Sequence, residues 1–153
     1  MDELSHVDAK GRASMVDVSG KPVQRRIARA RGRIEMAPGT LALVRENRMK
    51  KGDVLAAAQF AGIQAAKQTA RLIPLCHPLV LDRAGVRAVL ADGAVEAESE
   101  VVCVGRTGVE MEALTAVSVA LLTVYDMCKA VDKTMRIGKI VLLEKVKENV
   151  GQG

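Results

Sequence analysis

Hydrophobic and polar positions alternate along residues 23–36. Arginines crowd one side of this segment, and the other side carries small and apolar residues, namely Ala28, Ala30, Gly32 and Ile34. Alternation with a period of two residues is typical of a strand that buries one face. We therefore expect a strand here, with one charged face turned to solvent.

Two more strands are predicted over residues 85–91 and 94–104. An Asp92-Gly93 pair joins them, and an Asp-Gly pair between two apolar runs is a strong signal for a two-residue hairpin turn. Glutamates alternate with apolar residues along the second strand, which again predicts one solvated and one buried face. A last strand is expected through residues 140–143.

Helical spacing separates these strands. Pro38 opens a short helix, and Asp53 is suited to cap the start of a second helix over residues 54–71. The longest helix is expected over residues 109–131. It is apolar on nearly all sides between residues 113 and 124, so it needs more cover than one sheet provides, which favours an oligomer.

The order strand, helices, two strands, helix, strand predicts an α+β fold of the ferredoxin-like type, in which an antiparallel sheet carries its helices on one face. The chain has 153 residues, which is enough to bury a core. We expect a single domain over residues 1–153, with the polar residues 1–21 as a flexible N-terminal arm.

Composition narrows the choice of partner. The formal net charge of +5 and the isoelectric point of about 9.3 favour an anionic partner. Proteins that bind single-stranded nucleic acid stack the bases on aromatic side chains, and this chain has one Phe, one Tyr and no Trp. We therefore expect a phosphorylated small molecule rather than nucleic acid.

The N-terminal residues, the apolar runs and the cysteines and histidines predict where the protein is located and whether it binds a metal. The first residues resemble no secretory signal, and no apolar run approaches the roughly 20 residues that span a bilayer, so a cytoplasmic protein without a membrane partner is expected. Three cysteines without CxxC spacing and two histidines predict no disulfide, no metal site and no cofactor.

His77 stands between Pro74 and Pro78, which fix the backbone on both sides of it. Histidine is the side chain best suited to proton transfer near neutral pH, although a histidine in a rigid turn is about as often held by a backbone partner. Cys76 beside it is interpreted as a buried thiol rather than a nucleophile.

The start of the longest helix combines Arg106 and two glycines with free backbone N–H groups, an arrangement that resembles an anion cradle. Glu110 and Glu112 follow in the first turn. These carboxylates either complement the helix dipole or bind the N–H donors of a purine-like ring, and both interpretations remain open here.

At the other end of this helix, Asp126 and Lys129 form either a surface ion pair or part of a site, and Lys51 is suited to phosphate binding or proton transfer. Glu112 and Asp126 are fourteen residues apart, about 21 Å along a helix. No small substrate touches both within one chain, so a pocket that uses both lies between chains. We expect Lys51 and Lys129 at opposite sides of that shared pocket.

Six motifs occur in order between residues 4 and 146 and resemble the MoaC family, the cyclic pyranopterin monophosphate synthases of molybdenum cofactor biosynthesis. They are Met15-Val16-Asp17-Val18-Ser19, Lys51-Gly52-Asp53-Val54, Ala61-Gly62-Ile63-Gln64-Ala65-Ala66-Lys67, Leu72-Ile73-Pro74-Leu75-Cys76-His77-Pro78-Leu79, Thr107-Gly108-Val109-Glu110-Met111-Glu112-Ala113-Leu114 and Tyr125-Asp126-Met127-Cys128-Lys129-Ala130.

The resemblance implies a lyase that converts (8S)-3′,8-cyclo-7,8-dihydroguanosine 5′-triphosphate to cyclic pyranopterin monophosphate and releases pyrophosphate. It implies that Asp126 is catalytic and that Lys51 and Lys129 belong to the pocket, and we expect Lys51, Lys129 and His77 to be catalytic as well. The substrate-binding residues that it implies are Leu75, Cys76, His77, Glu110, Met111 and Glu112. It also implies a homohexamer, a trimer of dimers with active sites between subunits.

Two rival functions use the same features. One is a non-catalytic module that binds nucleotides or RNA, and the other is a phosphatase-like hydrolase on the same fold. The scarcity of aromatic residues counts against RNA, and the motifs rich in acidic and basic groups count against a passive binder. Product analysis separates the hydrolase, because it would leave the purine-derived ring untouched.

Overall fold

The computed structural model describes residues 7–151. Within this range the strands form an antiparallel sheet in the order β2-β3-β1-β4. The strands are β1 (Gln24–Glu35), β2 (Arg83–Ala91), β3 (Ala94–Gly105) and β4 (Arg136–Asn149), and the helices are α1 (Pro38–Arg45), α2 (Val54–Leu72) and α3 (Glu110–Cys128).

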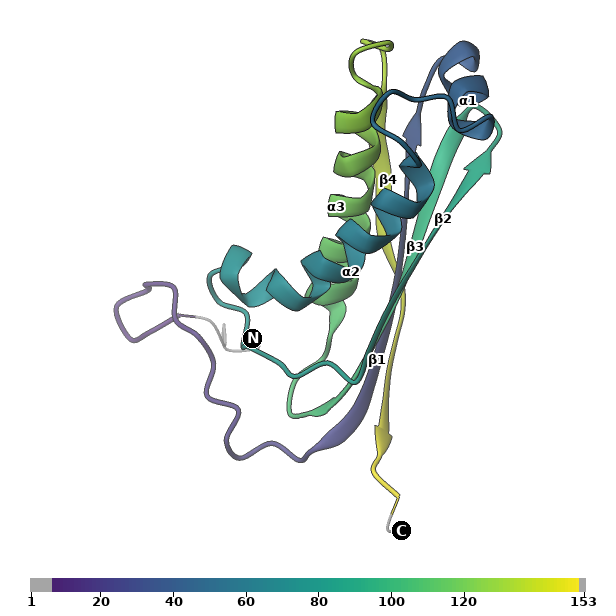
Figure 1. Ribbon diagram of the computed structural model, residues 1–153. Coiled ribbons are helices and arrows are strands. Elements are labelled where there is room, and N and C mark those ends of the chain that lie inside the picture. The colour runs from purple at the N-terminus through teal and green to yellow at the C-terminus, as the bar shows by residue number, and fades with distance from the viewer. Residues whose placement is uncertain (1–6, 152–153) are drawn as a thin grey trace.

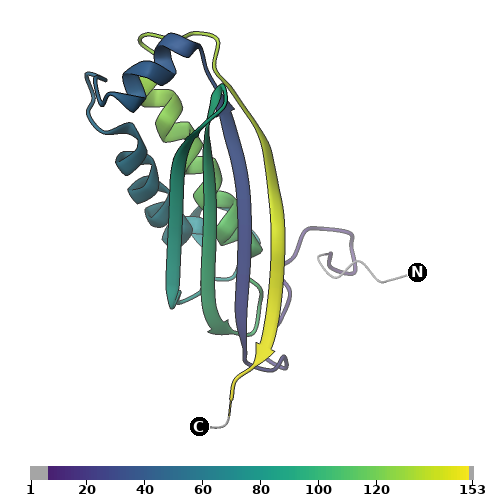
Figure 2. The same ribbon diagram turned by 90° about the vertical axis from the view of Figure 1, so that its right-hand side faces the viewer.

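The two long helices, α2 and α3, lie on the same face of the sheet (Figures 1 and 2). They contact each other, α3 also packs on β1, and α2 also packs on β2. The short helix α1 lies at the end of the sheet where β1 finishes (Figure 1). This arrangement confirms the predicted α+β, ferredoxin-like fold.

β1 shows why the alternation along the chain is so regular. Its inward side chains, among them Ala30 and Ile34, are fully buried under the helices. Its outward arginines meet glutamates of the neighbouring strands: Arg29 forms ion pairs with both Glu100 and Glu144. Figure 2 looks onto this outer face of the sheet.

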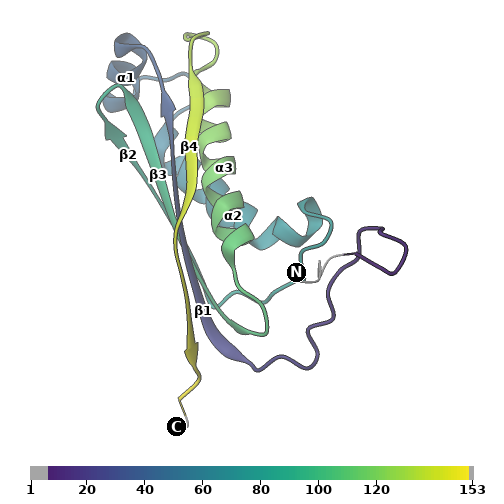
Figure 3. The same cartoon turned by 180° about the vertical axis from the view of Figure 1, so that it is seen from behind.

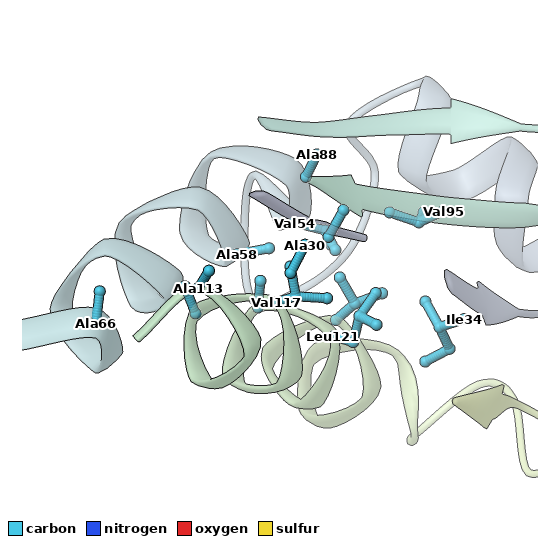
Figure 4. Packing of buried hydrophobic residues seen from close by; sticks show 14 of the residues in the cluster. Ala30, Ile34, Val54, Ala58, Ala66, Ala88, Val95, Ala113, Val117 and Leu121 are labelled. Atoms are coloured by element: carbon cyan, nitrogen blue, oxygen red, sulfur yellow. The ribbon is translucent and has the colours of Figure 1, made fainter. Parts of the chain in front are cut away.

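Small residues let the helices pack close to the sheet and to each other. A Cβ atom on Gly32 of β1 would lie 2.8 Å from a methyl group of Leu121, and one on Gly62 of α2 would lie 2.8 Å from the carbonyl oxygen of Ala116. Figure 4 shows small residues in the same core, where Ala58 of α2, Ala30 of β1 and Ala113 of α3 lie near Val117. Close approach of backbones therefore replaces bulky side chains in this core.

Two of the predicted boundaries are wrong. α3 ends at Cys128 rather than near residue 131, because the backbone of Val131 and Asp132 turns back to bond the carbonyl oxygen of Cys128. β4 is much longer than residues 140–143. Its pairing with β1 shifts register twice, and Lys139 has a φ of 52°, so the alternation of side chains is broken and its signal is short.

α3 also corrects the expectation that no stretch is long and apolar enough to span a membrane. By length and composition alone α3 meets that description. In the folded chain, however, nine of its 19 residues are buried against the sheet and α2, as expected for a core helix.

Residues 7–23 form no helix or regular strand and run along the end of the molecule beneath α2 (Figure 3). An isolated bridge joins Val7 and Ala13. The first six residues of the predicted N-terminal arm lie outside the described residues. The division into one domain with a flexible arm over residues 1–21 stays a prediction.

Candidate functional site

A cleft of about 430 Å³ opens at the N-terminal end of α3. Three parts of the chain form its walls: the segment before β1, the turn after α2 and the first turn of α3 with β4 beside it. The lining residues are Val16, Val18, Lys21, Leu75, Cys76, His77, Leu79, Thr107, Gly108, Glu110, Met111, Glu112 and Lys145. Every residue that the sequence assigned to substrate binding is in this set.

His77 holds one wall of the cleft in place. Its Nε2 atom lies 2.7 Å from the carbonyl oxygen of Val16. A carbonyl oxygen only accepts, so Nε2 must carry the proton and donate, which leaves Nδ1 as the acceptor of the neutral ring. The histidine therefore has the backbone partner considered above and still lines the cleft.

Two carboxylates on the first turn of α3 have opposite electrostatic environments. Glu112 is only 4% exposed, and burial raises its pKa. Burial alone would also raise the pKa of Glu110, but the hydrogen bond and charge of Lys145, 2.9 Å away, outweigh it and lower that pKa. Glu110 is thus held as an anion, whereas Glu112 is a carboxylate short of positive partners.

Cys76 is a poor nucleophile in this setting. Its thiol is half-buried, and burial raises its pKa, with a further rise caused by the negative charge of Glu112. The thiolate is the reactive form of cysteine, so the interpretation of Cys76 as an unreactive wall residue fits the structure.

A smaller cavity of about 160 Å³ adjoins the cleft and shares Gly108, Glu110 and Lys145 with it. Arg26 and Lys147 add two cations there. Arg26 donates from a terminal nitrogen to the carbonyl oxygen of Arg106 at 3.3 Å, but its buried Nε has no hydrogen-bond partner among residues 7–151. The cleft and this cavity together therefore carry an excess of positive charge beside the two glutamates.

A second group of functional candidates lies at the other end of α3. We call Lys51, Asp126 and Lys129 the cation cluster. The Nζ of Lys51 lies 2.8 Å from Oδ2 of Asp126, and the Nζ of Lys129 lies 2.6 Å from Oδ1. The hydrogen bonds from Lys129 and then from Lys51 lower the pKa of Asp126 to about 2. In return, the hydrogen bond to Asp126 and its negative charge raise the pKa of Lys129.

The local sequence explains how Lys51 reaches this position. The turn that contains it continues into Gly52, whose φ of 99° strongly favours glycine, and Asp53 then caps α2 by accepting from the N–H of Ala56 at 3.0 Å. Lys51 also donates to the backbone carbonyl oxygen of Asp126 at 3.2 Å. The turn is therefore tied directly to the last turn of α3.

This geometry corrects one expectation. Lys51 and Lys129 do not face each other across a pocket between chains; both contact the same carboxylate of their own chain. No local pattern in the sequence indicates that the turn before α2 packs on the end of α3. The separation of Glu112 and Asp126 at opposite ends of α3 is, however, as expected, since both lie on the same helix of 19 residues.

Several lining residues were not singled out from the sequence. Lys145 and Lys147 carried no local signal, because their place in the site depends on the sheet pairing that brings β4 beside β1 and the start of α3. Lys21 precedes β1 and belongs to none of the recognised motifs. Val16 and Val18 stand in the first of the recognised motifs, so only the resemblance pointed to them. Within residues 7–151 no group of three or more His, Cys, Asp or Glu side chains is arranged to hold a metal ion.

Comparison with known proteins agrees with the motifs. The model of the MoaC family matches residues 15–148. The cyclic pyranopterin monophosphate synthases of Chloroflexus aggregans and Thermomicrobium roseum are each 60% identical to this chain over 147 residues, which is 95% of this chain and 89% of each relative. The synthase of Desulfitobacterium hafniense is 57% identical over 144 residues, 94% of this chain and 88% of the relative.

The match covers nearly the whole chain and includes both the cleft and the cation cluster. The chain therefore belongs to the MoaC family.

Proposed function

We propose that the cleft and the cation cluster are two halves of one active site, each half supplied by a different chain. The chain is an enzyme of molybdenum cofactor biosynthesis, a cyclic pyranopterin monophosphate synthase. At the composite site it converts (8S)-3′,8-cyclo-7,8-dihydroguanosine 5′-triphosphate to cyclic pyranopterin monophosphate and releases pyrophosphate. Membership of this family favours the synthase over the two rival hypotheses, a passive binder and a simple hydrolase.

The observation that carries the proposal is the distance between the halves. Glu112 and Asp126 stand about 21 Å apart along α3, so a nucleotide-sized substrate bound in the cleft does not reach the cation cluster of the same chain. If two α3 helices run antiparallel about a twofold axis, each cleft meets the cation cluster of the other chain. A dimer then has two complete sites, and three dimers give the proposed homohexamer.

The surface of α3 between the two ends is suited to such a contact. Met111 and Leu122 are exposed, Leu122 at 56%, and Tyr125 lies at the margin of exposure. Exposed apolar side chains in a row between two halves of a site are typical of an interface rather than of a free surface.

Within the cleft, the glutamates are suited to the ring of the substrate. Carboxylates accept hydrogen bonds from paired N–H groups such as those of a guanine-derived ring. Glu112, short of cationic partners in its own chain, is the stronger candidate, and Leu75 and Met111 offer apolar contacts to the ring faces. His77 and Cys76 complete this wall.

The cations beside the glutamates are suited to the triphosphate. Lys21 and Lys145 line the cleft, and Arg26 and Lys147 line the adjoining cavity. When a hydroxyl oxygen of the sugar bonds to the α-phosphorus, it loses its proton, and the bond from that phosphorus to the pyrophosphate breaks. Fixed cations stabilise the negative charge that develops on the leaving pyrophosphate.

The cation cluster is suited to proton transfer. Asp126 is ionised, with a pKa of about 2, and it favours the protonated form of Lys129. Lys129 in this state is an acid and a fixed cation, not a base. Hydrogen-bond acceptors on the ring of the substrate would compete with Asp126 for both lysines, so the N–H groups of the lysines become available where that ring is remodelled.

The test is complementation between inactive variants. His77→Ala removes the cleft half of the site and Lys51→Ala removes the cluster half. Random mixing through co-expression makes half of all dimers heterodimers, each with one intact site, so about a quarter of wild-type activity should return. Mass spectrometry of the products of the cyclic triphosphate gives the activity.

Lys51→Ala mixed with Lys129→Ala is the matched control. Both lysines belong to one cluster of one chain, so their mixture should stay inactive. If the mixture of His77→Ala and Lys51→Ala stays inactive as well, in oligomers shown to be mixed, the composite site is wrong.

A further inference from the structure

Asp132 is a buried carboxylate that neither half of the site uses. It is 4% exposed and lies in the turn between α3 and β4. Oδ2 accepts from the N–H of Ala37 and from Oγ1 of Thr40, both at 2.9 Å. Oδ1 accepts from the N–H of Thr134 at 2.8 Å and from its Oγ1 at 2.7 Å. Both oxygens thus have two donors.

These donors keep Asp132 ionised, although it forms no ion pair with any residue that the structure describes. Burial alone would raise its pKa, but the hydrogen bonds from Ala37, Thr134 and Thr40 outweigh it and hold the pKa at about 2. An anion that is buried and satisfied by four neutral donors has one fixed position. Asp132 is therefore a rigid link between the elements that supply those donors.

The elements it links are α1 and the end of α3. Ala37 is the N-cap residue of α1 and provides no side-chain cap of its own. Asp132, 95 residues further along the chain, instead accepts from the backbone N–H of this N-cap residue and places a negative charge at the positive end of the helix dipole. The start of α1 is thus fixed to the turn that follows α3.

The far end of α1 leads to the cation cluster. After Arg45 the chain continues through the turn that holds Lys51, and Lys51 reaches back to Asp126 on the last turn of α3. The segment 37–51 is therefore attached to the end of α3 twice. Its attachment through Asp132 is buried, whereas the attachment through Lys51 is half-exposed.

We propose that Asp132 is a positioning residue of the enzyme: by fixing the start of α1 to the end of α3, it sets where the Nζ of Lys51 lies relative to Asp126. This rests on the proposed function, in which Lys51 and Asp126 work at the same substrate. The alternative is that Asp132 only stabilises the fold. Asp132 touches no residue of the cleft or of the cation cluster through its carboxylate, so it acts through α1.

The first variant is Asp132→Asn, which keeps the size of the side chain but presents an NH₂ group to two of the donors. Misplacement of a catalytic group by about 1 Å costs up to about 100-fold in rate. We therefore expect kcat to fall at least about tenfold, while KM changes less than about threefold because the cleft and its cations are untouched.

The matched control is Gln59→Met. Gln59 accepts from the N–H of Ala88 at 3.0 Å and so ties α2 to β2, away from both halves of the site. This variant also loses a partly buried link between distant elements, so its melting temperature should fall as well. Its kcat should stay within about twofold of the wild type, because a lost link in itself does not move Lys51.

A second readout does not depend on turnover. Trace acetylation followed by peptide mass spectrometry measures how fast each lysine amine reacts. In the wild type, Lys51 is protected by its hydrogen bonds to Asp126. Asp132→Asn should increase the labelling of Lys51 at least about threefold relative to the exposed Lys67, and Gln59→Met should leave that ratio unchanged.

If Asp132→Asn fails to fold, Thr40→Val tests whether Asp132 positions Lys51. It removes one donor of the link while the side chain keeps its branched shape. Here we expect kcat to fall about threefold and the labelling of Lys51 to rise.

A folded Asp132→Asn or Thr40→Val enzyme with wild-type kcat and wild-type Lys51 labelling would overturn the proposal. Failure of the wild type to form the cyclic monophosphate would instead overturn the proposed function, and the labelling would still report on Asp132.

Discussion

Two glutamates that are separated by a single residue show how strongly local surroundings decide the role of a side chain. Glu110 and Glu112 lie in the same helix turn and carry the same charge, yet Lys145 pairs with Glu110, while Glu112 is buried and forms no ion pair among residues 7–151. The pKa of Glu110 is lowered and that of Glu112 is raised. In the proposed site, binding of N–H donors falls to Glu112, a group whose charge is costly in the empty enzyme.

That cost predicts opposite effects of Gln substitutions on stability. Because burial raises the folded-state pKa of Glu112, its charge destabilises the fold above that pKa, and Glu112→Gln should raise the melting temperature at about pH 7. The expected rise is about 2–4 °C, the change that about 1 kcal/mol gives in a domain of this size. The gain should vanish as pH falls below the unfolded-state value, where both states are protonated.

Glu110→Gln is the control with the opposite sign. Its folded-state pKa is lowered, so its charge stabilises the fold above the unfolded-state value, and this stability is lost as pH falls through the folded-state pKa. The variant should therefore melt lower than the wild type at about pH 7 and approach it near pH 3. Thermal unfolding at the two pH values measures both effects; a lower melting temperature for Glu112→Gln at neutral pH would contradict the reasoning.

At the scale of elements, most helices and strands were predictable because their sequences carry their own period or cap, whereas the broken alternation of β4 indicated only its middle. The alternation in β1, the Asp92-Gly93 hairpin and the cap at Asp53 all concern neighbouring residues. The contacts between elements carry no such signal. The attachment of Lys51 to the end of α3, and of Asp132 to the start of α1, joins residues 75 and 95 positions apart, so only the folded chain shows them.

Gly62 offers a test of how α2 and α3 meet. Ala is normally the better residue inside a helix, by about 1 kcal/mol. At Gly62, however, the added Cβ would lie 2.8 Å from the backbone oxygen of Ala116, so the helices must separate. We expect Gly62→Ala to lower the free energy of unfolding by about 1–3 kcal/mol in urea titrations.

Gly39→Ala serves as its control. Gly39 lies in the first turn of α1, and a Cβ there meets no other atom within 4 Å. The substitution should leave stability unchanged or raise it by up to about 1 kcal/mol. Equal effects of the two substitutions would show that contact between α2 and α3 is not what Gly62 serves.

At the scale of the whole molecule, the outer side of α3 is an apolar surface that the rest of the chain leaves uncovered. The sequence predicted excess apolar surface on this helix, and the structure places Leu122 and Tyr125 on it, outside the core. The sequence did not predict which side would remain uncovered, because that depends on where α2 packs. The number of chains in the assembly remains a prediction.

Leu122→Arg tests that surface. An arginine at a position that is 56% exposed costs a free chain little, but in a contact between two α3 helices it would bury a charge. Light scattering should show an even-numbered oligomer for the wild type, most simply six chains, and smaller species with little activity for Leu122→Arg. Gln64→Arg adds the same charge to an exposed position of α2 and should change neither.

The wall that His77 holds has a consequence for how large a ligand the cleft admits. Val16 and Val18 belong to a segment with no helix or strand to support it, and the hydrogen bond from His77 is the link that ties this segment to the turn after α2. One such bond contributes about 1 kcal/mol. Displacing this wall is therefore cheap compared with deforming the sheet or α3 on the other sides. The volume of about 430 Å³ is therefore not fixed on this side of the cleft, and shape selection rests on the rigid sides.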